Sequence, residues 1–198
     1  MVDPSAARRT MCRTGRRNHD QEVTDERETI MSTTTVEAGE YRVDAAASTI
    51  SFTTRHMFGL GAVRGTFALR EARVDVADDP ARSSVRAVVD AGSVDTGIEA
   101  RDRAVSSAVY LDAARHPDIV FVAGGAQGAG EDWVLRGQLT VRGVSAPLDL
   151  RVEQVRVDGS QVRVVATTVV DRFAFGITAA RGMTGRRLRL RLEVVARR

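Results

Sequence analysis

His56 is the side chain in this sequence best placed to hydrogen-bond a polar group inside an apolar interior. It follows Phe52 and Thr54 at two-residue steps, so in a strand it shares a face with the phenyl ring. Its imidazole can donate or accept a bond to a ligand; the alternative is a core histidine satisfied by the backbone or a neighbouring side chain. His19 and His116 have no metal-ligand spacing to it, so no metal site is predicted.

Arginine supplies a second kind of chemistry, because a guanidinium binds phosphate oxygens bidentately. Arg55, Arg64 and Arg172 are the candidates for contact with an anionic head group, and each has an alternative role in surface solvation or in a structural pair with an aspartate. The sequence offers no set of nucleophile, base and orienting residue, since its one cysteine is Cys12 in a polar arm. We therefore expect no catalytic residues, no cofactor and no enzymatic activity.

The charge of the chain is spread along it. Among 198 residues, all 29 basic side chains except histidine are arginine, and 26 acidic ones leave a net charge of +3. Most arginines alternate with apolar residues, which is typical of the solvated face of a strand. The locally basic end, 186–198, lacks interleaved aromatic residues for stacking on bases. No nucleic-acid partner is expected.

The polar, aperiodic residues 1–37 are predicted to be a disordered arm, and 38–198 to be one domain. Met31 is an alternative start, which would leave a short lead into the first strand. No apolar stretch has the length of a secretory signal or a membrane span, so the expected location is the cytoplasm.

Alternation of apolar and polar residues dominates from Tyr41 onward and predicts about eight antiparallel strands. Leu188, Leu190, Leu192 and Val194 alternate with charged residues. Two Val-rich segments flank 158–161, which predicts a hairpin with Val157 opposite Val162 and Arg156 opposite Arg163. The Gly-rich run 123–130 is interpreted as a loop.

One segment departs from the strand pattern. Thr96 and Glu99 have the spacing of a capping box and precede good helix formers, so a short helix is predicted near 98–109. Strands that are apolar on one face either close into a barrel with a lumen or pack as a filled sandwich. The periodicity alone fits both arrangements.

Short motifs in a particular order resemble the YceI-like polyisoprenoid-binding family, from Tyr41 to the C-terminal strand. They are 41–44, 51–56, 63–67, 90–96, 137–144 and 171–177, with Arg101-Asp102, Tyr110-Leu111-Asp112 and His116-Pro117 between them. The resemblance implies an all-β fold: an antiparallel lipocalin-like β-barrel of about eight strands, with one short helix covering an end. It also implies that the barrel encloses a long isoprenoid or a similar amphiphile.

The residues expected to line such a lumen come from several strands, and all but His56 are apolar. They are Ile50, Phe52, His56, Phe58, Phe67, Val85, Val89, Phe121, Leu139, Val141, Phe175, Leu190 and Leu192. The alternative is a core that these side chains fill completely.

The leading hypothesis is a protein that carries or sequesters a polyisoprenoid or isoprenoid quinone. The alternatives are a lipid-metabolism enzyme that uses His56 in the same cavity, and an interaction module whose arginine-rich face meets a membrane or a protein. The sequence leaves open whether the protein touches a membrane surface transiently and whether it forms a homodimer.

Overall fold

Ten strands form one antiparallel sheet in this computed structural model, which describes residues 36–56, 59–129 and 132–198. They are β1 (Gly39–Val43), β2 (Thr49–His56), β3 (Gly61–Phe67), β4 (Leu69–Val76), β5 (Ser84–Asp90), β6 (Asp118–Ala129), β7 (Asp132–Val141), β8 (Val144–Asp158), β9 (Gln161–Asp171) and β10 (Arg187–Arg197). Helix α1 (Glu99–Ser106) and the short 3-10 helices η2 (Pro80–Arg82) and η3 (Arg172–Phe175) lie between strands.

The described residues form one compact unit. Val36 already packs against buried residues of this unit, and Glu37 accepts a hydrogen bond from the Tyr41 hydroxyl at 2.9 Å. Among the described residues, contacts with the barrel therefore begin at Val36, and the predicted boundary at residue 38 stays a prediction. The predicted disorder of the arm falls on residues that lie, apart from 36 and 37, outside the described ranges.

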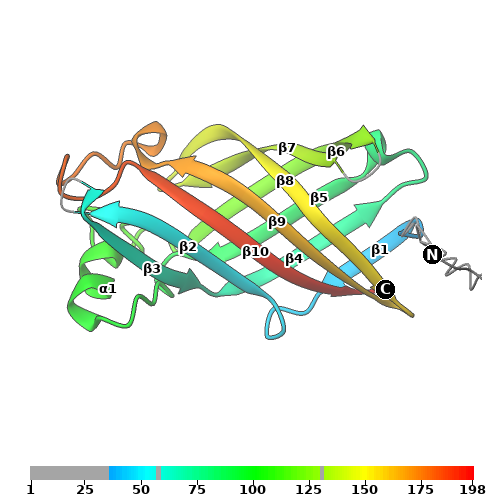
Figure 1. The fold of residues 1–198 in the computed structure, drawn as a ribbon, viewed down its shortest axis with the longest axis horizontal. Coiled ribbons are helices and arrows are strands. Elements are labelled where there is room, and N and C mark those ends of the chain that lie inside the picture. Colours follow the sequence, from blue (N-terminus) through cyan, green and yellow to red (C-terminus); the bar gives the residue numbers. More distant parts are fainter. Residues whose placement is uncertain (1–35, 57–58, 130–131) are drawn as a thin grey trace, which may run out of the picture. The chain divides into compact units, whose positions relative to one another are not determined.

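The sheet closes because β1 pairs on both of its sides. Tyr41 of β1 lies opposite Val74 of β4, and Val43 lies opposite Ala196 of β10. This contact joins β1, β4, β5, β6, β7, β8, β9 and β10 into a ring. The β2–β3 hairpin extends the sheet from the first half of β10 (Figure 1). The predicted antiparallel barrel of about eight strands is confirmed.

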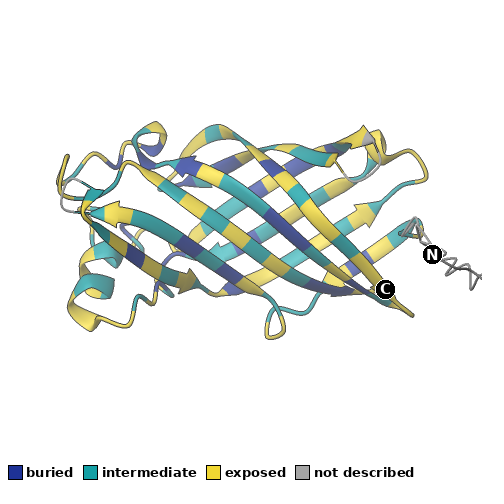
Figure 2. Ribbon diagram, in the orientation of Figure 1, coloured by how far each residue is buried: buried dark blue, intermediate teal, exposed yellow. Residues whose placement is uncertain are grey.

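Alternation along the strands separates an inner from an outer face. In β10, Leu188, Leu190 and Leu192 are half-buried, whereas Arg189 and Arg191 are exposed. The same banding runs along most strands of the barrel (Figure 2). Charged side chains therefore cover the outside, as the spacing predicts.

The β8–β9 hairpin has the predicted register. Arg156 lies opposite Arg163 and Val157 opposite Val162, and Gly159 in the turn has a φ of +57°. A positive φ is readily adopted by glycine, which explains the residue at this position.

The Gly-rich run 123–130 was interpreted as a loop, and this is wrong for most of its length, because β6 extends to Ala129. Its register with β7 shifts after Ala123, and Gly125 has a φ of +88°. A Cβ on Gly125 would lie 2.5 Å from the Ala81 carbonyl oxygen. The glycines thus serve a bulge and a close backbone approach, two functions of glycine within strands.

Helix α1 is present but shorter than the predicted 98–109, and the capping box is absent. Ile98 is the N-cap, and no side chain caps it. Thr96 instead donates from its backbone N–H and its hydroxyl to Asp102 Oδ1, at 3.0 and 2.5 Å. Of the helices in the described ranges, none has the length and hydropathy to cross a bilayer.

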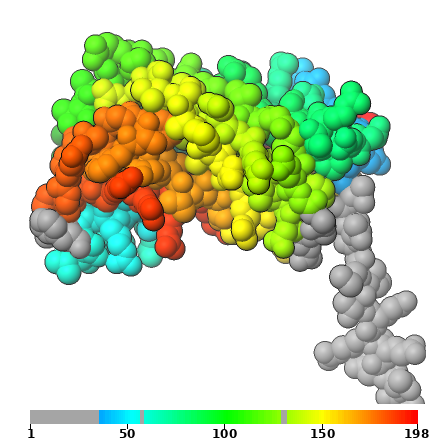
Figure 3. Space-filling model, turned by 90° about the horizontal axis from the view of Figure 1, so that it is seen from above, coloured from blue at the N-terminus to red at the C-terminus, as the bar shows by residue number. Residues whose placement is uncertain are grey.

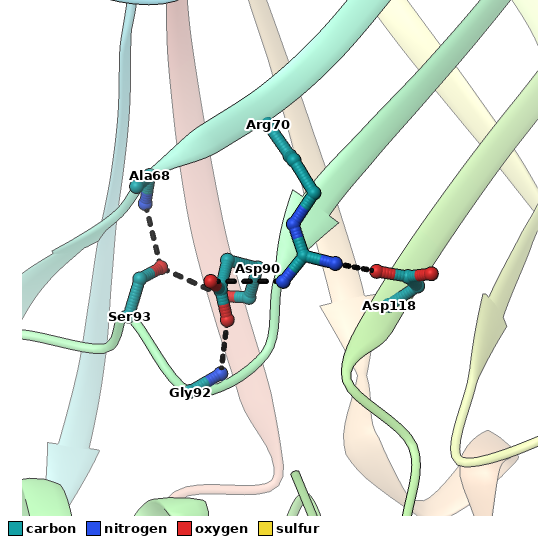
Figure 4. Close-up of polar contacts among 6 residues, drawn as sticks. All are labelled: Ala68, Arg70, Asp90, Gly92, Ser93 and Asp118. Atoms are coloured by element: carbon teal, nitrogen blue, oxygen red, sulfur yellow. Dashed lines mark hydrogen bonds and ion pairs between the residues drawn. The ribbon is translucent and has the colours of Figure 1, made fainter.

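A polar network fixes the segment that leads to α1 (Figure 4). Arg70 forms an ion pair with Asp90 at 2.9 Å and a second one with Asp118. Asp90 also accepts a bond from the Gly92 N–H at 2.8 Å. The hydrogen bond from Arg70, followed by the bond from Gly92, holds the pKa of the Asp90 carboxyl below its usual value.

Candidate functional site

Apolar residues lie opposite one another on neighbouring strands, so the inner face of the barrel is apolar around the ring. Phe52 lies opposite Leu190, and Phe121 lies opposite both Ala87 and Leu139. The inner face includes most of the predicted lumen residues: Ile50, Phe52, Phe67, Val85, Val89, Phe121, Leu139, Val141, Leu190 and Leu192. Phe175 comes from η3 and joins the same core cluster. Phe58 lies outside the described residues.

The interior is apolar but not close-packed. No large side chain in the described ranges is less than 2% exposed. Leu188, Leu190 and Leu192 point inward yet remain half-buried. A filled core would bury such side chains almost completely. The arrangement therefore favours a lumen with space over a filled sandwich.

Side chains close both ends of the barrel. At the end where α1 lies, called the helix end below, Leu111, Phe175 and Ile177 are buried in the main core cluster. At the opposite end, called the hairpin end because it holds the β8–β9 turn, Tyr41 and Val162 form a second buried cluster with neighbouring residues. Entry along the barrel axis would have to displace these residues.

The wall itself is open on one side, between β8 and β9. These strands pair only from Arg151 opposite Thr167 to the turn. Towards the helix end, residues 144–150 of β8 still pair with β7 and residues 168–171 of β9 still pair with β10, but they do not pair with each other. Figure 1 shows the two strands diverging there. We call this opening the slit.

One hydrogen bond crosses the slit, from Thr168 Oγ1 to the Asp149 carbonyl oxygen at 2.7 Å. Pro147 lies on its β8 edge and has no N–H to offer a neighbouring strand. At the point where the ladder resumes, Glu153 accepts a bond from the Thr167 hydroxyl at 2.9 Å and forms an ion pair with Arg191 at 3.1 Å. The closed part of the seam is thus fastened on the outside.

A groove of about 1000 Å³ lies at the slit. Its lining includes Phe52, Leu148 and Leu190 of the inner face together with Arg151 and Arg189 of the outer face. Residues from the inner and the outer face of the wall line the same groove, so the slit connects the lumen with the surface. A space of this size is within the usual range for small-molecule sites.

His56 lies at the end of β2, and its ring covers Gly61. A Cβ on Gly61 would approach His56 Nε2 to 2.3 Å, so the hairpin accommodates the half-buried ring only because residue 61 has no side chain. Within the described ranges, no group of three His, Cys, Asp or Glu side chains is arranged to hold a metal ion.

The predicted head-group arginines do not meet at one place. Arg55 and Arg64 are exposed, and Arg64 lies opposite Thr53 on the outer face, because both are out of phase with Phe52. Arg172 is buried and donates to the carbonyl oxygens of Gly185, Ile177 and Thr184 at 2.9, 2.7 and 3.0 Å. Burial lowers the pKa of Arg172. The geometry assigns Arg172 a structural role, and head-group contact by any of the three arginines stays a prediction.

Three guanidinium groups surround the Phe173 ring. Those of Arg172, Arg181 and Arg186 lie 5.0, 5.3 and 5.1 Å from its centroid. Arg186 also pairs with Asp171 at 2.6 Å, and its hydrogen bond lowers the pKa of that carboxyl. Positive charge therefore gathers at the helix end next to the slit.

Several lining residues were not predicted from the sequence, namely Ala123, Leu135, Leu148, Leu150, Thr168, Val170 and Ile177. Alternation in 146–150 was available as a signal, but Pro147 interrupts it. Thr168 is polar, so the apolar pattern does not include it. Only the structure shows that it lines the groove and bonds across the slit.

The chain belongs to the YceI-like domain family, whose profile matches residues 41–196. A UPF0312 protein of Pectobacterium atrosepticum is 33% identical over 86 residues, which is 43% of this chain and 42% of that protein. The chain thus aligns with less than half of that relative's length.

Solved structures share the fold. The BcnA protein of Burkholderia cenocepacia superposes with a TM-score of 0.67 at 22% identity, covering 77% of this chain and 98% of that one. A polyisoprenoid-binding domain from Saccharophagus degradans superposes with a TM-score of 0.63 at 16% identity, covering 79% and 97%. At these identities the likeness concerns the fold alone.

Proposed function

We propose that this protein binds a long apolar amphiphile, such as a polyisoprenoid or an isoprenoid quinone, in the barrel lumen and carries or sequesters it. One observation carries the proposal: the apolar side chains of the inner face are only partly buried, so they do not fill the lumen. The polyisoprenoid-binding domain of Saccharophagus degradans, which has the same fold, supports the choice of ligand class. The protein then acts by binding rather than by catalysis.

Burial of apolar surface supplies the driving force. An apolar chain that hides about 400 Å² from water gains about 10 kcal/mol before the costs of ordering and association. Only apolar chains gain on this scale from walls built of Val, Leu, Ile and Phe. The ligand class is therefore set by the wall, and a polar head group would remain at an opening.

The slit is the proposed route of entry, because both barrel ends are closed by side chains. Separating β8 from β9 further breaks the single bond between Thr168 and Asp149, whereas opening an end displaces a buried cluster. A chain can thus enter sideways at a smaller energetic cost. The cytoplasmic location remains a prediction from the sequence, and whether the protein forms a homodimer remains open.

Extraction of the protein, purified from its native source, with organic solvent tests the proposal. Mass spectrometry of the extract is expected to show a prenyl lipid at close to one molecule per chain. A mock purification from cells that lack the protein is the control. An extract without lipid, together with a crystal structure whose lumen is filled by side chains, would overturn the proposal.

A further inference from the structure

Three segments meet at the helix end, and Thr184 joins them. His56 of β2 forms a β-bridge with Thr184, and the Gly185 N–H donates to the Arg55 carbonyl oxygen at 2.6 Å. The Tyr110 hydroxyl hydrogen-bonds Thr184 Oγ1 at 3.2 Å. Consequently the β2–β3 hairpin, the segment after α1 and the η3–β10 loop are neighbours, and Figure 3 shows the hairpin and the loop at the same end of the barrel.

Exposed apolar side chains gather at this end. The five most exposed large hydrophobic residues of the described ranges are Leu60 (87%), Val109 (60%), Ile98 (52%), Val169 (51%) and Met183 (49%). Leu60, Val109 and Met183 lie on the three joined segments, Ile98 caps α1, and Val169 borders the slit. Such clustering marks an interaction site rather than the scattered exposure that is normal on a surface.

Positive charge accompanies these apolar tips. Arg181, Arg186 and Arg187 come from the same η3–β10 loop and the start of β10, and all three are exposed. Asp171 pairs with Arg186, but no carboxylate within the described ranges forms an ion pair with Arg181 or Arg187. Arg181 and Arg187 thus form no ion pair among the described residues, and they lie at the same end of the barrel as the exposed apolar side chains.

We propose that the exposed apolar and arginine side chains of the helix end, together called the basic rim, dock the protein on an anionic lipid bilayer. Leu60, Val109 and Met183 enter the interfacial region, and Arg181 and Arg187 bind lipid phosphates. The inference rests on the proposed lipid-carrier function and adds its partner. Because the slit opens towards the same end, docking brings the entrance close to the membrane from which an apolar chain is taken.

Binding to vesicles tests the rim. Wild-type protein is expected to co-sediment with vesicles of equal parts phosphatidylcholine and phosphatidylglycerol, to bind vesicles of phosphatidylcholine alone weakly, and to be released by high salt. The double variant Arg181→Gln/Arg187→Gln is expected to bind the anionic vesicles about 30-fold more weakly, at about 1 kcal/mol for each basic residue. Leu60→Asp is expected to weaken binding to a similar extent.

Matched controls come from the hairpin end. Arg156→Gln/Arg163→Gln removes the same charge, and Val157→Asp makes the same type of apolar-to-acidic change at an exposed side chain. Both are expected to bind within about twofold of the wild type, because the β8–β9 turn lies at the end of the barrel opposite the rim (Figure 1). Equal weakening by rim and control variants, or no preference of the wild type for anionic vesicles, would overturn the docking site.

A separate measurement distinguishes this inference from the carrier function. Binding of a soluble prenol is measured without vesicles for the wild type and both double variants. Rim variants that keep prenol binding but lose vesicle binding support docking. Wild-type protein that binds prenol but not anionic vesicles overturns the docking inference alone, and failure to bind prenol overturns the carrier function itself.

Discussion

Arg172 stabilises the helix end from a buried position. Its guanidinium reaches three backbone carbonyl oxygens that belong to the loop between η3 and β10, and its side chain is held beside the Phe173 ring. The planar fork of arginine matches this set of acceptors, whereas an ammonium group cannot reach all three.

Arg172→Lys is therefore expected to reduce the free energy of unfolding by about 3 kcal/mol, since two buried carbonyl groups lose their donor. Urea denaturation measures the change. Arg181→Lys at the exposed neighbour is the control and is expected to unfold like the wild type. Equal stability of Arg172→Lys and the wild type would contradict the structural role.

Gly137 makes room for an aromatic ring in the lumen wall. A Cβ at this position would lie 2.7 Å from the Phe121 ring and 2.5 Å from the Val122 carbonyl oxygen. Gly137→Ala is expected to lower the free energy of unfolding by about 1–3 kcal/mol, because the ring and the strand must shift. Gly124→Ala is the control, since nothing lies within 4 Å of a Cβ there. Thermal unfolding of both variants measures the effect. Equal stability of Gly137→Ala and Gly124→Ala would contradict a packing role for Gly137.

For single residues, the sequence predicts which side chains face inward but not which groups each side chain contacts. Phe52 and Leu190 follow from alternation, because a strand has a period of two. Arg55, Arg64 and Arg172 are each candidates for contact with an anionic head group; Arg55 and Arg64 face outward, as the same alternation predicts, and Arg172 is buried. The placement of Arg172 depends on contacts distant in sequence, such as that with Thr184, which no local pattern contains.

Among the elements, the unpaired stretch of β8 and β9 is the feature most closely tied to function. Thr168→Val removes the one hydrogen bond across the slit while keeping the shape of the side chain. A bound prenol is expected to dissociate about fivefold faster, in line with about 1 kcal/mol for such a bond. Stopped-flow transfer to acceptor vesicles measures the rate.

Thr167→Val is the matched control, since the Thr167 hydroxyl bonds Glu153 at the closed part of the same seam. It is expected to leave the rate unchanged. Identical rates for both variants and the wild type would mean that the ligand does not leave through the slit.

The approach to α1 depends on a charge pair that is sensitive to acid. Because the pKa of Asp90 is lowered in the folded protein, the pair stabilises the fold above the unfolded pKa near 4 and this stabilisation is lost as the pH falls through the folded value. Arg70→Gln is expected to lower the unfolding temperature by no more than a few degrees at pH 7, since the pair is exposed.

The difference between Arg70→Gln and the wild type is expected to shrink at acid pH, because protonation of Asp90 weakens the pair in the wild type as the pH falls through its lowered pKa. Arg73→Gln on the same strand serves as the control, because its contact with Glu40 is longer, at 3.8 Å. Melting curves at both pH values give the result. A constant difference at both would contradict the assignment to Asp90.

Elements with local signals were predicted well. The register of Val157 with Val162 follows from a tight turn, and the faces of β10 follow from strict alternation. The run 123–130 was misjudged because glycines serve a bulge as readily as a loop. Thr96 bonds Asp102 instead of capping α1, and the slit carries only one sequence signal, the proline at 147, which marks an unpaired edge.

The whole molecule is a barrel with closed ends, an apolar inner face and an opening in its wall. The basic rim and the slit both lie at the helix end, so the two ends of the barrel differ in their surfaces. None of these properties belongs to a single strand, so the sequence alone left both a filled sandwich and a hollow barrel open. The closure of β1 onto β4 and β10 is what joins the apolar faces into one lumen.

Titration with a long-chain polyprenol tests the central claim most directly, comparing the wild type with Leu190→Trp and Val122→Trp. Leu190 points into the lumen and lines the groove, whereas Val122 is exposed on the outside of β6. Wild type and Val122→Trp are expected to bind alike, and Leu190→Trp at least about tenfold more weakly, equivalent to about 1.4 kcal/mol. Equal affinity of all three folded proteins, or no binding by the wild type, would contradict a ligand in the lumen.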